Sequence, residues 1–419
     1  MDLWSGIPMW PALFPTPTRY GAIAANHDAD VVILGGGEAG ALCTWFLTQA
    51  GFRVVVLERH QIASGSTSAN TGLIQFSNDM PLSTMTHRHG QAEAVNFYRL
   101  CLDAINDLAA ICGSLSISPE FTRRNSLYYA SRKRDVIRLR DEYRTLRQHG
   151  FPVEFLDEVE IRERLPFSKP AALLTFGDAE VNPYRLTHAI FDDVIAKRSA
   201  KVFENSEVVN MKESASGVTV KTAQDFSVRA KVAIVATGYE AQDTYGTPGG
   251  VIGSTYAIAT EPIPDLSDWT ERSLIWETHR PYLYLRTTPD ERIIIGGLDE
   301  KVVDGLRRDE KLLPNAEKLR RQMVALFPMY ADAEIAYRWA GTFGSSVDGM
   351  PFVGRHPHYK HVLFALGYGG NGTVYYTLTG RILQDVLRDG DHPAMKMLNP
   401  DRLRWYRVLG ERVGQLFGE

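Results

Sequence analysis

Three glycines and one glutamate near the start of the chain have the types and the spacing that can hold a dinucleotide. Gly35, Gly37 and Gly40 form the pattern Gly-x-Gly-x-x-Gly, and Glu58 follows the middle glycine by about 20 residues. The first glycine permits a tight turn, the second lets a pyrophosphate approach the backbone, and the third lets a helix pack closely against a strand. An acidic side chain in the fourth place can accept hydrogen bonds from ribose hydroxyls. The pattern therefore predicts bound NAD or FAD and disfavours a 2′-phosphate.

The elements that must position these residues can be predicted from the same stretch. Residues 31–34 are all apolar and indicate a buried parallel strand, residues 38–50 indicate an apolar helix, and residues 53–57 indicate a second strand that ends at Glu58. The start of such a helix offers free N–H groups and a positive dipole end to phosphates. A glycine-rich structural turn, which is the simpler interpretation, would not need the acid.

A second polar segment follows at residues 63–73. It is a run of small hydroxyl, amide and glycine residues, which supplies many hydrogen-bonding groups with little bulk. Such a segment can follow a long cofactor along a pocket. The alternative is a polar surface loop, since the same residue types are common in turns.

A late glycine-rich block has the form of another dinucleotide motif. It is Gly367-x-Gly369-x-x-Gly372, preceded by a predicted strand at 361–366 and followed by a predicted helix at 374–387. No strand ending in an acid follows that helix, and too little chain remains for a second nucleotide domain. We interpret the block as a loop and helix N-terminus that close over the flavin end of the first cofactor, where a positive dipole would stabilise a reduced, anionic flavin.

These blocks, in this order, resemble the D-amino-acid oxidase (DAO) family of FAD-dependent oxidoreductases. That family includes glycine and sarcosine oxidases, D-amino-acid dehydrogenases, γ-glutamylputrescine oxidase, and related enzymes that oxidise glycerol phosphate or 2-hydroxyglutarate. The resemblance runs from about Ala29 to Leu387, and the further matching blocks are residues 65–72, 232–238 and 339–372. It implies an α/β fold with a Rossmann-like FAD-binding domain and an interleaved substrate domain on a mixed or antiparallel sheet, as in glutathione-reductase-2-like proteins.

The resemblance also implies where FAD is bound. The implied contacts lie in the glycine motif, the polar segment, two later strands and the late glycine block, on Gly35, Gly37, Glu38, Gly40, Glu58, Arg59, Ser66, Thr67, Ser68, Asn70, Gly72, Leu73, Val208, Thr237, Gly238, Gly369, Gly370, Asn371, Gly372 and Thr373. The cysteine that tethers flavin in monomeric sarcosine oxidases has no counterpart, because Cys43, Cys101 and Cys112 all lie early in the chain. No histidine tether lies near residues 66–72, so we expect non-covalent FAD.

Candidate substrate-binding residues lie in the predicted antiparallel strands. A substrate carboxylate would be held best by an arginine fork, and Arg286 is the leading candidate. Tyr282, Tyr284 and Arg286 share one face of a strand, since side chains alternate along it. Tyr256, on the preceding strand, could donate its hydroxyl to the substrate. The alternatives are a surface arginine for Arg286 and a plain core residue for Tyr256.

The predicted reaction is oxidation of an amino acid or an amine. Hydride would pass to flavin N5, the resulting imine would hydrolyse in water, and O2 or another acceptor would reoxidise the flavin. One alternative is oxidation of a 2-hydroxy acid or a polyol phosphate, because residues 66–70 resemble those of the glycerol-phosphate enzymes. The other is a flavin-binding subunit without turnover of its own.

Composition sets the remaining expectations. The chain has 419 residues, enough for two domains with substantial cores, and its net charge of −4 argues against a nucleic-acid partner. Three irregularly spaced cysteines fit a reducing compartment, and no apolar run approaches the ~20 residues that span a bilayer.

Prolines and the lack of a basic cluster in residues 1–26 argue against a signal peptide, so we expect a cytoplasmic protein. Peripheral membrane contact and the oligomeric state stay open. The histidines lack neighbours at ligand spacing, so no metal is expected.

The expected domain organisation is interleaved. Residues 1–26 form an extended arm that lies over the body or a partner subunit, and residues 389–419 form a C-terminal helix. The other ranges are residues 27–80, 171–245 and 339–388 for the FAD-binding domain, and residues 81–170 (mostly helical) and 246–338 (antiparallel strands) for the substrate domain.

Overall fold

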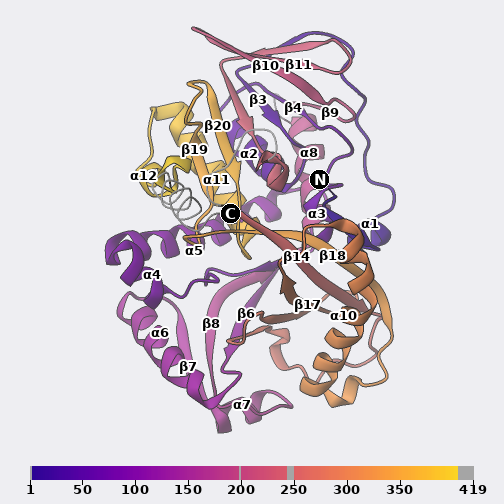
Figure 1. Cartoon of the computed structure of the whole chain (residues 1–419), viewed down its shortest axis with the longest axis vertical. Helices are drawn as coiled ribbons and strands as arrows, with labels where there is room; N and C mark the ends of the chain where they lie inside the picture. Colours follow the sequence, from indigo (N-terminus) through magenta and orange to yellow (C-terminus); the bar gives the residue numbers. More distant parts are fainter. Residues whose placement is uncertain (1, 198–199, 243–249, 404–419) are drawn as a thin grey trace, which may run out of the picture.

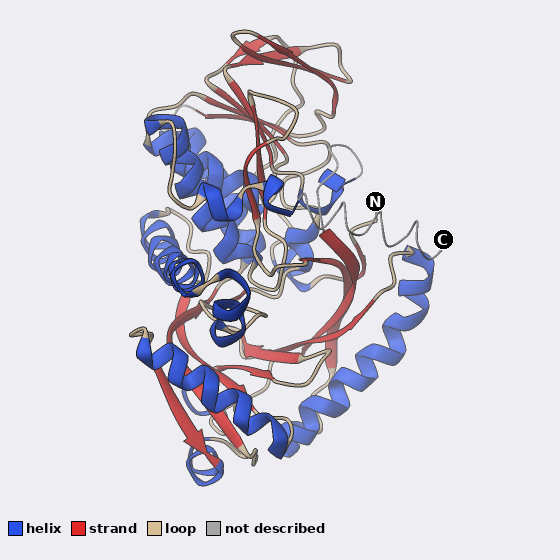
Figure 2. Cartoon of the chain, turned by 60° about the vertical axis from the view of Figure 1, so that its left-hand side comes forward, coloured by secondary structure: helices blue, strands red, loops and turns tan. Residues whose placement is uncertain are grey.

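The computed structural model describes residues 2–197, 200–242 and 250–403, and their strands form three sheets. Figures 1 and 2 show two small sheets in the upper half of the molecule and one large curved sheet in the lower half. The fold is therefore mixed α/β, and the expected Rossmann-like half joined to a half built on a mixed sheet is confirmed.

The first small sheet has six strands, in the order β19-β20-β13-β3-β4-β9. All neighbours pair in parallel except β19 and β20. The strands are short apolar runs, as expected for a parallel sheet that is covered on both faces. Their bounds are β3 Val31–Leu34, β4 Val54–Leu57, β9 Ala200–Phe203, β13 Val232–Val235, β19 Phe352–Arg355 and β20 Val362–Leu366.

Side chains of β3 point alternately to the two faces of the sheet, so they pack in two separate hydrophobic cores. Val31 and Ile33 pack against helices, whereas Val32 and Leu34 pack against the four-stranded sheet. That second sheet consists of β10 Val208–Ser214, β11 Gly217–Thr222, β12 Ser227–Ala230 and β2 His27–Asp28, in this order.

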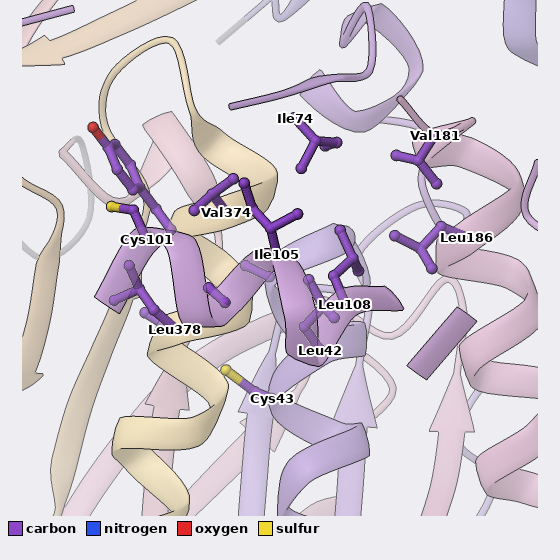
Figure 3. Packing of buried hydrophobic residues seen from close by; sticks show 14 of the residues in the cluster. Leu42, Cys43, Ile74, Cys101, Ile105, Leu108, Val181, Leu186, Val374 and Leu378 are labelled. Carbon is purple, nitrogen blue, oxygen red and sulfur yellow. The ribbon is translucent and has the colours of Figure 1, made fainter. Parts of the chain in front are cut away.

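Four helices fill the other face of the six-stranded sheet. Leu42, Ile105, Leu108 and Leu378 interlock where three of them meet (Figure 3). The helices are α2 Glu38–Gln49, α5 Gln91–Ser114, α8 Pro183–Lys197 and α11 Gly372–Asp389. This core fixes the starts of α2 and α11, the two helices that open on glycine-rich turns.

The large sheet has ten strands, in the order β1-β18-β14-β17-β16-β15-β6-β8-β5, with β7 beside β8. Most pairs are antiparallel, and β15 pairs with β6 in parallel. The bounds are β1 Trp4–Gly6, β5 Leu73–Ile74, β6 Thr122–Tyr129, β7 Val153–Asp157, β8 Ala171–Glu180, β14 Gly250–Thr260, β15 Leu274–Glu277, β16 Leu283–Thr287, β17 Ile293–Glu300 and β18 Ile335–Ser346.

Helices cover the large sheet from outside. The longest is α10, Gly305–Leu326, whose Leu319 and Met323 pack on Ile293 and Ile295 of β17. The others beside this sheet, or in the loops around it, are α1 Met9–Leu13, α3 Ser66–Ala69, α4 Leu82–His89, α6 Val136–Gln148 and α7 Glu158–Arg164.

Several local expectations differ from the structure. Residues 246–338 contain α10 as well as strands, and Pro314 inside this helix obscured its pattern. Residues 81–170, expected to be mostly helical, also contain β6 and β7. β8 pairs with β6 in the large sheet, although its residues were placed in the FAD-binding domain. Of the C-terminal helix expected at 389–419, residues 404–419 lie outside the described residues. The described part contains α12 Met395–Leu398 and a 3-10 turn at Pro400–Leu403 instead of one continuous helix.

The N-terminal arm lies on the body of its own chain. Its strand β1 pairs with β18, and Arg308 of α10 donates hydrogen bonds to Ser5 and Asp2. The indole N–H of Trp4 donates to the Ser64 carbonyl at 2.8 Å, and that of Trp10 donates to the Asn70 carbonyl at 2.6 Å. The arm is thus fastened to the polar segment as well as to the sheet.

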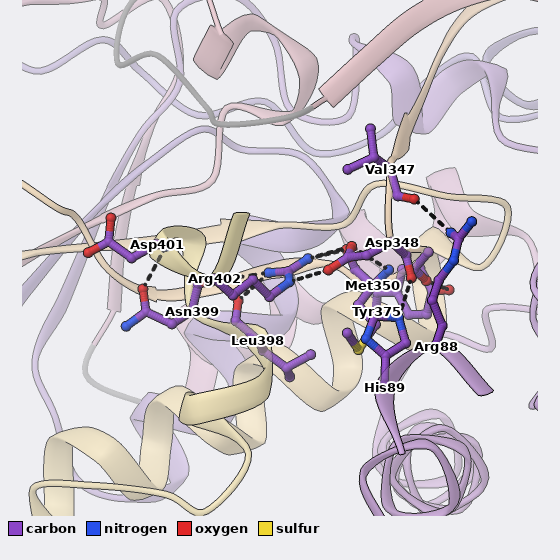
Figure 4. A network of polar contacts seen from close by, with 11 residues as sticks. Arg88, His89, Val347, Asp348, Met350, Tyr375, Leu398, Asn399, Asp401 and Arg402 are labelled. Atoms are coloured by element: carbon purple, nitrogen blue, oxygen red, sulfur yellow. Dashed lines mark hydrogen bonds and ion pairs between the residues drawn. The ribbon is translucent and has the colours of Figure 1, made fainter. Parts of the chain in front are cut away.

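The last described turn holds the connection between β18 and β19. Arg402 forms an ion pair with Asp348, with N–O distances of 2.6 and 3.0 Å, and donates to the Met350 carbonyl (Figure 4). Arg88 and His89 of α4 contact the carbonyls of Val347 and Asp348. None of the described helices is long and apolar enough to cross a membrane.

Candidate functional site

One cavity of about 590 Å³ runs from the six-stranded sheet to the inner face of the large sheet. It begins beyond the carboxyl ends of β3, β4 and β13, where open α/β sheets bind ligands. It continues past the polar segment and the late glycine block. Most of the predicted FAD contacts line it, namely Gly35, Gly37, Glu38, Glu58, Arg59, Ser66, Thr67, Asn70, Leu73, Val208, Thr237, Gly238, Gly369, Gly370, Asn371 and Gly372.

Four predicted FAD contacts do not line the cavity. Each of them instead contacts a neighbouring residue of the protein. The Ser68 hydroxyl donates to the Ala63 carbonyl, and the Thr373 hydroxyl accepts from Asn70. The carbonyl of Gly72 accepts a hydrogen bond from an arginine, and Gly40 packs against the turn beneath it. These residues shape the site from behind.

The glycine turn forms a backbone cradle. Gly35 has φ +110°, which favours glycine, and a Cβ on Gly40 would lie 2.0 Å from the Gly35 carbonyl oxygen. A Cβ on Gly37 would meet only the Thr67 hydroxyl, at 3.2 Å, and would otherwise enter the cavity. The three glycines thus do different work, and the space beside Gly37 fits a pyrophosphate at the start of α2.

Glu58 stands where a ribose would be held. Its carboxylate accepts hydrogen bonds from the backbone N–H groups of Gly36 and His60, each at 2.7 Å. Burial raises the pKa of this carboxyl, against the effect of the two hydrogen bonds. The neighbouring Arg59 is paired with Glu240 at 2.6 Å.

Buried polar atoms along the cavity lack hydrogen-bond partners within the described part of the chain. They are Oε1 of Glu38, Nε2 of Gln75 and Oγ1 of Thr237. Buried polar groups are nearly always paired, so these atoms fit a polar ligand. Burial also raises the pKa of Glu38 to about 7, although Thr373 and Asn70 donate to it. The backbone cradle, the carboxylate of Glu58 and the unpaired polar atoms together fit bound FAD.

The late glycine block closes over the middle of the cavity. The backbone N–H of Gly370 donates to the Asp79 carboxylate at 2.9 Å, and the Asn371 amide donates to the Ser77 carbonyl at 2.7 Å. These bonds fasten the start of α11 to the loop after β5. The positive end of the helix dipole therefore faces the cavity, as the sequence suggested.

The far end of the cavity is built by side chains of the large sheet. Thr255, Trp276, Tyr284 and Asp299 come from β14, β15, β16 and β17, and Tyr282 immediately precedes β16. Asp79, from the loop after β5, accepts a hydrogen bond from the Tyr282 hydroxyl at 2.8 Å. Of this group, Tyr284 was expected as a site residue, and Tyr282 was expected on the same strand face.

Arg286 does not reach the cavity, contrary to the expectation that it clamps a substrate carboxylate. Its side chain is 0% exposed and donates to the carbonyls of Gly72 and Val181, at 2.7 and 2.9 Å. The guanidinium also lies over the Trp10 ring, 5.4 Å from its centroid. It holds the polar segment in place from below.

Tyr256 lies on the wrong face for the role that was expected of it. It packs in the core between the large sheet and α10, whereas its neighbour Thr255 faces the cavity. Its pKa is raised to about 12 by burial and by Glu300. The alternative of a core tyrosine was the better one.

One signal for the far end was present in the sequence. Gly296 pairs with Tyr284, and a Cβ there would lie 2.3 Å from the tyrosine hydroxyl oxygen. A glycine inside a strand marks a close approach of this kind. Asp79 and Asp299 belong to no local pattern, so sequence reasoning missed them.

Cys43, Cys101 and Cys112 are buried and do not line the cavity. Within residues 2–197, 200–242 and 250–403, no group of three metal-ligating side chains is found.

Comparisons with known proteins agree with this geometry. The model of the family described as DAO, FAD dependent oxidoreductase, matches residues 30–386. The γ-glutamylputrescine oxidoreductase of Escherichia coli is 28% identical over 373 residues, which cover 86% of this chain and 83% of that protein. The glycine oxidase of Geobacillus kaustophilus is 25% identical over 389 residues, covering 86% and 93%. Its crystal structure has a TM-score of 0.75 with this one, at 21% identity, over 90% of this chain and 99% of that one.

Proposed function

The chain belongs to the DAO family of FAD-dependent oxidoreductases, and on that premise we propose that it oxidises the carbon next to an amine nitrogen, in an amine or an amino acid. The observation that carries this proposal is the continuity of one cavity. It joins the glycine cradle to the side chains of the large sheet, past the start of α11.

Bound FAD supplies the acceptor for a hydride from the substrate carbon. The chain's own groups hold and orient the reactants. The backbone beside Gly37 would hold the pyrophosphate, Glu58 would hold the ribose, and the N–H groups at the start of α11 would favour negative charge at the flavin end. Trp276, Tyr282 and Tyr284 form the wall that positions the substrate carbon and excludes water.

The products follow from the bonds that change. A neutral amine that loses hydride from the adjacent carbon becomes an iminium ion, which water hydrolyses to a carbonyl compound and an amine or ammonia. The two electrons taken from the substrate would finally go to O2 or another acceptor. No lysine, arginine or histidine within the described residues lines the far end of the cavity, so nothing there favours the alternative substrates, 2-hydroxy acids and polyol phosphates.

We also propose that FAD is held without a covalent bond. We further propose that the boundaries between the two domains coincide with the boundaries between the sheets. The two small sheets and their helices would form the FAD-binding domain, and the large sheet with α6, α7 and α10 the substrate domain. Precipitation with acid should release all the flavin into the supernatant. Flavin that stays with the protein pellet would contradict the non-covalent assignment.

The experiment that tests the function is anaerobic bleaching of the flavin absorbance. Purified holoenzyme is mixed with D- and L-amino acids, N-methyl amino acids, primary amines, polyamines and 2-hydroxy acids. Bleaching by an amine or amino acid is expected, and readmission of air then separates an oxidase from a dehydrogenase. Bleaching by hydroxy acids alone, or no bleaching by any compound, would contradict the proposal; the second result is the one expected of a non-catalytic subunit.

A further inference from the structure

We propose that the substrate is a cationic amine that carries no carboxylate beside its nitrogen, and that Asp79 and Asp299 select it by charge. This inference rests on the proposed function and narrows its substrate class. It concerns the far end of the cavity, which Trp276, Tyr282 and Tyr284 enclose together with the two acids.

The ionisable side chains of the cavity are divided between its two ends. The basic ones that line it, Arg59 and His60, lie beside Glu58 at the ribose end. At the far end the lining charges are Asp79 and Asp299, and no basic side chain of the described chain lines it. A substrate carboxylate would therefore meet two negative charges and no partner, a juxtaposition that costs several kcal/mol at an interface.

The two arginines nearest in sequence to the far-end strand are already engaged by backbone carbonyls. Arg286 is fully buried under the polar segment and donates to two of them. Arg280 lies over the Tyr282 ring and donates to the carbonyls of Glu277, His279 and Asp79, and its charge also acts on the Asp299 carboxyl. Neither one lines the cavity, so neither offers the two parallel N–H groups that a carboxylate needs.

Neither acid forms an ion pair within the described part of the chain. Asp79 accepts hydrogen bonds from the Tyr282 hydroxyl and the Gly370 N–H, which are neutral donors. Burial and the charge of Asp79 raise the pKa of Asp299 to about 6, against the opposing effects of Thr255 and of the charge of Arg280. A cation between them would relieve this repulsion.

The rest of the far end also suits an ammonium group. Trp276, Tyr282 and Tyr284 offer aromatic faces, which attract cations. Gln75, itself 7% exposed, lines the same cavity with an amide nitrogen that has no partner among the described residues. This donor indicates a polar ligand with an acceptor atom in the cavity and does not itself favour a cation.

The acids also suit the reaction. A protonated amine has no lone pair to assist hydride loss, so it must first give a proton to a carboxylate, which becomes a carboxylic acid. Departure of hydride from the adjacent carbon then leaves a positive charge on the C=N unit of the product. The second carboxylate lies where that charge develops, and fixed charges of this kind lower the barrier.

The test uses holoenzyme and matched pairs of compounds. Each pair is an α-amino acid with a single amine and the amine left when its carboxylate is removed: leucine and 3-methylbutylamine, phenylglycine and benzylamine, alanine and ethylamine. For every pair that reacts, kcat/KM from anaerobic flavin reduction should be at least ~100-fold higher for the amine. Equal or faster reduction by the amino acid would overturn the inference while leaving the proposed function intact. Reduction by no member of any pair would overturn both.

A binding experiment separates recognition from turnover. Benzyltrimethylammonium is a permanent cation whose nitrogen has neither a proton to give nor a lone pair to assist hydride loss. It should perturb the flavin spectrum and inhibit competitively. Benzoate, which has a similar ring and the opposite charge, should do neither at the same concentrations. Tight binding of benzoate would overturn the inference.

Variants assign the effect to the acids. Asp299→Asn should lower kcat/KM for the best amine by ~100-fold and weaken the binding of benzyltrimethylammonium, with flavin content unchanged. Asp79→Asn should have the same two effects when rates are expressed per bound flavin, because Asp79 also accepts the Gly370 N–H that fastens the late glycine block. The matched control is Glu300→Gln, which removes the same charge one residue away; Glu300 pairs with Lys311 outside the cavity. If the control and the aspartate variants lose activity alike, the acids do not select the substrate.

Discussion

The two ends of the cavity are built by different means. At the ribose end, neighbouring residues of one turn contribute mainly backbone, at Gly35, Gly37 and the start of α2. At the far end, side chains such as Trp276 and Asp299 come from separate strands of the large sheet. The first end depends on local spacing, and the second depends on which face of each strand turns inward. A cofactor site can therefore be recognised from sequence where a substrate site cannot.

The largest effect is expected when a side chain is placed in the backbone cradle. Gly37→Val directs a branched side chain into the cavity, where a cofactor would lie, and should weaken FAD binding by more than ~100-fold. The protein should still fold, because only the Thr67 hydroxyl lies near the new Cβ. Flavin content of the purified protein and its circular dichroism are the measurements. The control is Gly21→Val in the arm, where a Cβ meets nothing within 4 Å. A fully flavinated Gly37→Val protein would show that the backbone beside Gly37 is not where the cofactor binds.

Arg286→Ala tests whether this residue belongs to the far end or to the scaffold. Two charge-assisted hydrogen bonds to buried carbonyls are lost, so the free energy of unfolding should fall by about 3 kcal/mol. Thermal unfolding measures this, and Arg338→Ala at an exposed position of β18 is the control. If stability is unchanged and only KM rises, Arg286 is a substrate residue after all.

Glu58→Ala should weaken FAD binding less than Gly37→Val does. Loss of one charged hydrogen-bond acceptor should reduce the binding free energy of FAD by about 1.5–3 kcal/mol. This corresponds to a roughly 10- to 100-fold larger dissociation constant. Titration of the apoprotein with FAD measures it, and excess FAD should restore the turnover number. A turnover number that stays low at saturating FAD would mean that Glu58 also affects the far end.

The smallest effect concerns pH at the far end. The charged and titratable groups around Asp299 are Asp79, Arg280, Tyr282 and Tyr284, and the pKa of Asp299 is about 6. A raised carboxyl pKa stabilises the ligand-free fold at low pH, and that contribution is lost as pH rises through about 6. Cation binding needs the ionised form, so it should tighten by up to tenfold per pH unit below 6 and level off above it. Spectral titration with benzyltrimethylammonium from pH 5 to pH 8 measures this. Binding that weakens with rising pH would contradict the role of Asp299.

The sequence predicted the backbone half of the site and part of the fold. The spacing of Gly35 to Gly40, and the acid at Glu58, depend on local geometry, so the turn, α2 and β4 lie where they were expected. The strands β14, β16 and β17 were also found, because alternation and a turn mark them.

What could not be predicted depends on long-range packing. Arg286 was placed on the correct face of its strand, but only the fold shows that the Gly72 and Val181 carbonyls cover it. Tyr256 was assigned to the inner face, and its register in β14 turned it outward. Asp79 and Asp299 come together from distant segments, which no local pattern records.

The arm has a consequence for how the protein matures. Asp2, Leu3 and Trp4 line the cavity, and β1 completes the large sheet beside β18. During synthesis β1 leaves the ribosome long before β18 exists, so the arm cannot take its place until most of the chain has been made. In the folded protein the docked arm covers part of the cavity and would delay the escape of a bound flavin.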